Sequence, residues 1–165
     1  MGLVVAGFLL TRFAPQVATS LVLFPGALPQ APWRLLTYPL VSGSILGLVF
    51  DLLFLWWVGN ELETIYGSRR FATFCALASA VGGLTYLGMA AAKGAAGFAF
   101  GASAPVLALL VLYAFHYPTR EIRFYGIFPI QIRWLLVIYL AVDLSNSLGG
   151  VPWTNLYHLG GAAFG

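Results

Sequence analysis

Hydrophobic residues follow one another along this chain in long runs and do not alternate with polar ones. Six such segments can be traced, at 2–10 with an extension toward residue 23, 44–58, 71–92, 102–117, 134–148 and from about residue 154 onward. Alternation predicts strands, whereas continuous apolar runs approaching about 20 residues predict membrane-spanning helices. We therefore predict an all-α bundle of six helices and expect the first and last of them to be truncated in this chain.

The composition places this bundle in a membrane. Hydrophobic residues make up 61% of the chain and charged residues only 8%, whereas soluble domains average roughly 25% charged residues. Backbone polar groups in lipid must be paired within the protein, which leaves helices or a closed barrel, and the continuous apolar runs favour helices. We predict a multi-pass integral membrane protein with a single domain over residues 1–165.

Basic residues are unevenly distributed among the loops. Arg69 and Arg70 follow the second segment, and Arg120, Arg123 and Arg133 lie between the fourth and fifth segments. Cytoplasmic loops of membrane proteins carry an excess of Lys and Arg, so we predict that these two loops face the cytoplasm. The net charge of +3 is then a consequence of topology and does not indicate a nucleic-acid partner.

One cysteine, Cys75, lies inside the third apolar run. A single cysteine excludes an intrachain disulfide, and no group of cysteines and histidines has the spacing of a metal site. We interpret Cys75 as a small buried apolar residue and expect neither a metal nor an organic cofactor.

Ser103 stands at the start of the fourth apolar run, in the small-residue stretch GAS at 101–103. The glycine-rich sequence before it is poorly suited to a spanning helix, and Pro105 suits the first turn of a helix. One interpretation makes Ser103 the N-cap of that helix. The other makes it a nucleophile, because the N–H groups and the positive dipole end at a helix start also stabilise an oxyanion.

His158 begins the stretch HLGGAAFG, in which Gly161 and Gly165 follow at spacings of about one helical turn. The three residues share one helix face, and the glycines allow a neighbouring helix to approach closely. A histidine on this face can form a structural interhelical hydrogen bond, or it can act as a base toward a serine on the neighbour. Ser103 and His158 together form a candidate catalytic dyad.

These motifs, with two others, resemble the rhomboid family of intramembrane serine proteases. Trp33-Arg34 in WRLLTY is similar to the Trp-Arg of the family's first external loop. WWVGNELETIYGSRRF is similar to its Gly-x-x-x-Glu…Gly-Ser segment, with Glu63 as the glutamate. GAS at 101–103 matches the family's Gly-x-Ser, and HLGGAAFG matches its sixth-helix motif. The resemblance extends over the chain from about Trp33.

The resemblance implies a six-helix core in which Ser103 is the nucleophile and His158 the general base. Gly101 and Ala102 would help to form the oxyanion site. Rhomboids cleave transmembrane segments of other proteins near the outer membrane face and need no cofactor. The implied partners are therefore transmembrane protein substrates and the lipid bilayer, without nucleic acid, and we expect a bacterial inner membrane as the location.

The second helix departs from the family at the oxyanion positions. Where the family usually has a His and, four residues later, an Asn, this chain has Gly47 and Asp51. Gly47 offers no side-chain donor, and losing one such donor typically costs about 10²–10³-fold in rate. An Asp51 carboxylate would repel an oxyanion, whereas a protonated Asp51 could donate a hydrogen bond. Asp51 could instead orient His158 as a third member of the site.

Three further positions differ from the family pattern. Ala104 replaces the glycine after the serine, and Leu107 replaces the aromatic residue that stacks on the catalytic histidine. Tyr157 precedes His158 where a small residue is usual. These differences leave two functions open, an active protease with a modified oxyanion site and a rhomboid-like pseudoprotease that binds membrane segments without cutting them. A small transporter or channel has less support, because the chain lacks a pair of matching broken helices.

Overall fold

The computed structural model describes residues 2–26, 28–43, 45–94, 97–124, 128–148 and 156–165. The helices are α1 (Gly2–Phe13), α2 (Pro15–Leu21), α3 (Arg34–Thr37), α4 (Ile45–Tyr66), α5 (Ser68–Lys93), α6 (Ser103–His116), α7 (Ile132–Leu148) and α8 (Leu156–Phe164), with a short 3₁₀ helix, η1 (Tyr38–Leu40). Helices dominate the described part of the chain, so the predicted all-α class is confirmed. One short antiparallel hairpin, β1 (Glu121–Phe124) with β2 (Phe128–Gln131), joins α6 to α7.

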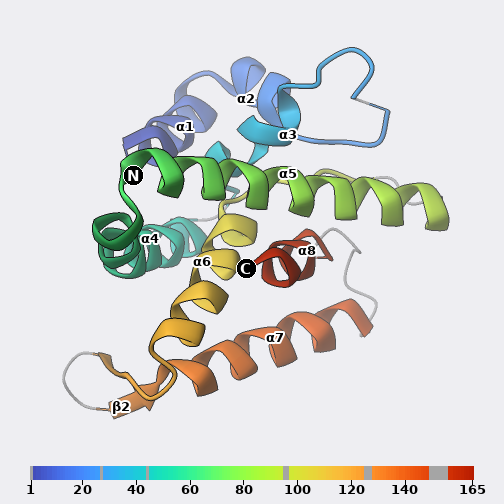
Figure 1. The fold of residues 1–165 in the computed structure, drawn as a ribbon. Helices are drawn as coiled ribbons and strands as arrows, with labels where there is room; N and C mark the ends of the chain where they lie inside the picture. Colours follow the sequence, from blue (N-terminus) through green and yellow to red (C-terminus); the bar gives the residue numbers. More distant parts are fainter. Residues whose placement is uncertain (1, 27, 44, 95–96, 125–127, 149–155) are drawn as a thin grey trace.

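Helix α6 lies at the centre of the bundle, where it contacts α4, α5, α7 and α8 (Figure 1). Every residue from 101 to 110 is buried, because the run from Ser103 onward is apolar on all sides and other helices surround it. Helix α8 packs against both α5 and α6. The central position of α6 therefore brings its first turn close to residues from several other helices.

Glycines set the close approach of α8 to its neighbours. A Cβ atom added at Gly161 would collide with the backbone of Ala104, and one added at Gly165 would collide with the backbone of Ala108. Small residues at such contacts allow helix backbones to approach in membranes, where packing replaces the hydrophobic effect as the main attraction. The structure thus places the glycine face of α8 directly against α6.

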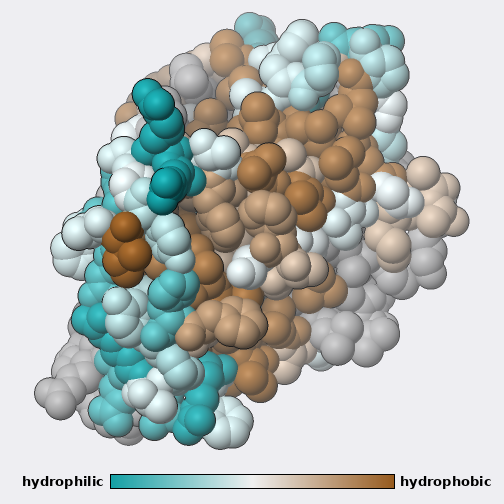
Figure 2. Space-filling view, viewed as in Figure 1, coloured by the Kyte–Doolittle hydropathy of each residue, from teal (hydrophilic) through white to brown (hydrophobic). Residues whose placement is uncertain are grey.

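The outer surface of the bundle is apolar over a broad band. Helices α4 and α5 are long and apolar enough to cross a membrane, and α6 and α7 contain shorter apolar stretches. Figure 2 shows hydrophobic residues over the middle of one face and hydrophilic residues along its left edge. Apolar side chains point outward on several helices, among them Ile45, Leu46, Val49 and Leu53 on α4, Leu77 and Leu84 on α5, and Val137 and Ile138 on α7.

The second apolar segment continues further than its hydrophobic pattern predicts. Helix α4 runs to Tyr66 and does not end near residue 58. Leu62 is fully buried within this extension, so the helix keeps an apolar side toward the bundle. It ends at Gly67, whose φ of 79° is accessible mainly to glycine, and α5 begins at the next residue. The loop that we expected to contain Arg69 and Arg70, after the second segment, is therefore mostly helical.

The first segment, expected to extend as one helix toward residue 23, is broken in two. Ala14 has non-helical backbone angles (φ −139°, ψ 70°) between α1 and α2, and Pro15 begins the second helix. Proline suits the first position of a helix but cannot continue one through its interior. The expected start of the sixth segment near residue 154 lies outside the described residues.

Candidate active site

The hydroxyl of Ser103 lies 2.7 Å from the imidazole of His158, measured from Oγ to Nε2. Ser103 is the first residue of α6, while Ala102 is the N-cap, and no side chain caps this helix. The capping interpretation of Ser103 is therefore wrong, because its hydroxyl is directed to the histidine of another helix. Ser103 is only 8% exposed, and His158 is half-buried.

The backbone before Ser103 is held in place by the segment between α2 and α4. Gly101 has φ of 108°, and its N–H donates to the carbonyl oxygen of Tyr38 at 3.2 Å. Two residues earlier, Ala99 and Leu23 exchange backbone hydrogen bonds of 2.8 and 3.1 Å. A side chain at Gly101 would be strained in this conformation, so the glycine allows the chain to turn into α6.

Tyr139 is a site residue that sequence reasoning missed. It projects from α7, and its ring centroid lies 6.4 Å from that of His158. Leu107, at the position where the family has its aromatic residue, is fully buried in the core. Nothing in the sequence distinguishes Tyr139 from the other aromatic residues of the fifth segment, because its proximity to His158 depends on how α7 and α8 pack.

Asp51 reaches the start of α6 from α4. Its carboxyl lies close to the Ala102 backbone N–H and lines the same cavity as Ser103 and His158. Gly47 lies on the same wall one turn earlier and contributes no side-chain donor. The two positions where the family has oxyanion donors thus lie beside the dyad, but a glycine and a carboxyl group stand there in place of the neutral donors.

A cavity of about 300 Å³ connects these groups. Ser103, His158, Asp51 and Gly101 line it together with apolar and aromatic side chains such as Phe50. Apolar pockets with a few convergent polar groups are the usual form of ligand sites. Among the described residues, no group of three or more His, Cys, Asp or Glu side chains is placed to hold a metal ion.

The other two motifs of the resemblance lie away from the dyad and organise the backbone. Arg34 donates to the carbonyl oxygens of Thr19 and Val22 at 3.0 and 2.7 Å, and its guanidinium lies 4.7 Å from the centre of the Phe24 ring. It therefore ties the loop after α2 to α3. At the start of α5, the hydroxyl of Ser68 donates to Glu63 at 2.6 Å and links α4 to α5.

Comparison with known proteins points to one family. Residues 29–165 match the family model described as Rhomboid domain. The chain is 30% identical over 137 residues to the rhomboid protease GlpG homolog of Cronobacter sakazakii, a match that covers 82% of this chain and 48% of that protein. It is 34% identical over 83 residues to rhomboid-like protein 19 of Arabidopsis thaliana, covering 50% of this chain and 26% of that protein. The matches thus span about half or less of these relatives' length.

Proposed function

Because the chain belongs to the rhomboid family, we propose that it is an intramembrane serine endopeptidase with Ser103 as nucleophile and His158 as general base. The observation that carries the proposal is the distance of 2.7 Å between Ser103 Oγ and His158 Nε2. That distance is within the range in which a base can take the proton of a hydroxyl nucleophile.

In the first step, Ser103 Oγ forms a bond to the carbonyl carbon of the scissile peptide while its proton passes to His158 Nε2. The carbonyl oxygen becomes an oxyanion. The peptide C–N bond then breaks, and His158 gives the proton to the leaving amine. Water, deprotonated by the same imidazole, hydrolyses the acyl-enzyme and releases Ser103.

The oxyanion would be stabilised chiefly by backbone groups. The first N–H groups of an α-helix have no partner within the helix and carry its positive dipole end, and Ser103 opens α6. Gly101 and Ala102 shape the turn that precedes it. The Asp51 carboxyl assists only when it is protonated, since a carboxylate beside the Ala102 N–H competes with an oxyanion for that donor.

The substrates would be transmembrane segments of other proteins that enter the cavity from the bilayer. The family is membrane-integral, and α4 and α5 have the length and composition of membrane spans. The same proposal assigns the protein to a bacterial inner membrane, with the Gly67 turn facing the cytoplasm. Glycines 161 and 165 would serve this activity indirectly by holding α8, and hence His158, against α6.

A fluorophosphonate probe, which labels activated serines, tests the proposal directly. Wild-type protein in detergent should be labelled, and Ser103→Ala should not. Ser79→Ala is the matched control, because Ser79 is also a buried serine but donates to the Cys75 carbonyl oxygen within α5. Equal labelling of wild type and Ser103→Ala would contradict the nucleophile. If neither protein is labelled and neither cuts a transmembrane substrate, although both still bind it, the protein is a rhomboid-like pseudoprotease that binds membrane segments without cutting them.

A further inference from the structure

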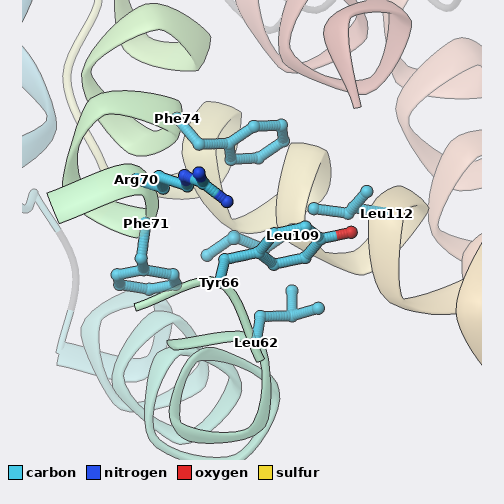
Figure 3. Close-up of a pocket in the computed structure, with 7 residues that line it drawn as sticks. All are labelled: Leu62, Tyr66, Arg70, Phe71, Phe74, Leu109 and Leu112. Carbon is cyan, nitrogen blue, oxygen red and sulfur yellow. The ribbon is translucent and has the colours of Figure 1, made fainter. Parts of the chain in front are cut away.

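A second cavity, of about 220 Å³, lies between α4, α5 and α6 and shares no lining residue with the cavity of the dyad. Its wall is made of aliphatic and aromatic side chains with one charged residue, Arg70 (Figure 3). In Figure 3 the Arg70 side chain extends between Phe74 and Tyr66, and its guanidinium points toward the space that these side chains line. The cavity is partly open to the outside, and its apolar walls favour contact with hydrocarbon over contact with water.

The carboxylates near this cavity are engaged by other groups. Glu61 forms an ion pair with Arg120 at 2.7 Å and accepts from the Tyr113 hydroxyl, and Glu63 accepts from the Ser68 hydroxyl. Within the described part of the chain, the Glu61 pair is the one salt bridge. The exposed Arg70 guanidinium can therefore accept an anion from outside the protein.

The location of Arg70 also favours an anion. It lies in the first turn of α5, which contains no acidic residue and whose N-cap, Gly67, has no capping side chain. The positive end of this helix dipole adds to the charge of Arg70. The turn at Gly67 joins two spanning helices, so it lies near lipid headgroups, and the distribution of basic residues predicts that it faces the cytoplasm, where anionic lipids concentrate.

We propose that this cavity binds an anionic phospholipid, with an acyl chain against Phe74 and Leu109 and the phosphate on Arg70. The lining favours a lipid over a free anion. A small ion would contact one charged group among apolar walls, whereas a phospholipid can place its phosphate on Arg70 and its acyl chain against the apolar side chains. The bound chain fills the space between α4, α5 and α6 and thereby stabilises the end of the bundle opposite the dyad.

Native mass spectrometry of the detergent-purified protein, mixed with equal amounts of phosphatidylglycerol and phosphatidylcholine, tests this site. Wild type should retain phosphatidylglycerol preferentially, and Arg70→Gln should bind it about fivefold more weakly. Arg69→Gln is the matched control, since it removes the same charge one residue away from a side chain outside the cavity. Arg70→Lys should keep the preference. Leu112→Trp, which fills the cavity but retains Arg70, should lose the lipid.

Four results would overturn the proposal. Equal weakening by Arg69→Gln and Arg70→Gln would mean that only the general surface charge attracts lipid. Equal retention of phosphatidylcholine would remove the role of the anionic headgroup. Displacement of the lipid by millimolar inorganic phosphate, or undiminished binding by Leu112→Trp, would exclude the acyl chain from the cavity. If Arg70→Gln fails to fold, the comparison of Arg70→Lys with Leu112→Trp decides the question alone.

Discussion

The backbone of Gly161 on α8 lies against the carbonyl group of Ala104 on α6, so closely that a Cβ atom would not fit between them. This contact is formed one residue after Ser103 and one helical turn after His158. The spacing between the two helices is therefore fixed by glycine at the level where the serine and the histidine meet. Any residue larger than glycine must move α8 outward and carry His158 with it.

Replacing Gly161 by alanine should lengthen the Ser103–His158 hydrogen bond and weaken the packing of α8. Overpacking in a well-packed contact costs about 1–3 kcal/mol, so the temperature of unfolding should fall and cleavage of a transmembrane substrate should slow by more than tenfold. Gly88→Ala is the control, because nothing lies within 4 Å of an added Cβ there. An unchanged cleavage rate in Gly161→Ala would show that α8 does not set the dyad.

The fold class and the dyad pair could be inferred from the sequence because each depends on local patterns. Continuous apolar runs predict helices, the GAS stretch predicts that Ser103 stands at a helix start, and the glycines after His158 predict a close helix contact. The family resemblance was confirmed by the match over residues 29–165. The distance of 2.7 Å between Ser103 and His158 could not be predicted, because it depends on the packing of helices far apart in sequence.

The structural features that the sequence did not predict depend on tertiary contacts or on single backbone angles. The extension of α4 to Tyr66 contradicts the expected loop, because the polar residues there occupy one side of a helix whose other side buries Leu62. The break at Ala14 follows from one proline. Tyr139 gave no signal at all, since an aromatic residue in a spanning segment has many possible neighbours.

Tyr113 should contribute to stability and not to catalysis. Its side chain is fully buried, and its hydroxyl donates to Glu61, which also pairs with Arg120. Tyr113→Phe leaves that carboxylate with one donor fewer, and a hydrogen bond to a charged group contributes about 1.5–3 kcal/mol. We expect a lower unfolding temperature with an unchanged cleavage rate per folded molecule. Additive losses in Tyr113→Phe, Glu61→Gln and their double variant would show that the two groups do not interact.

Tyr139 should act as a positioning residue for His158. Its ring packs near the imidazole with a centroid distance of 6.4 Å, and aromatic pairs contribute about 0.5–1.5 kcal/mol beyond their buried area. Tyr139→Ala should lower kcat roughly two- to tenfold with little change in KM, while Tyr139→Phe, which keeps the ring, should retain most activity. Equal losses in the two variants would assign the effect to the hydroxyl group and not to ring packing.

Asp51 should make cleavage depend on its own protonation. A carboxylate beside the Ala102 N–H competes with the oxyanion for that donor, whereas a protonated carboxyl can itself donate a hydrogen bond to the oxyanion. Asp51→Asn supplies a neutral donor at every pH. The rate of wild type relative to Asp51→Asn should therefore fall as pH rises and Asp51 loses its proton. Asp51→Ala, with no donor, should be slower than Asp51→Asn by about 10²-fold. A ratio independent of pH, with Asp51→Ala as fast as Asp51→Asn, would exclude Asp51 from oxyanion stabilisation.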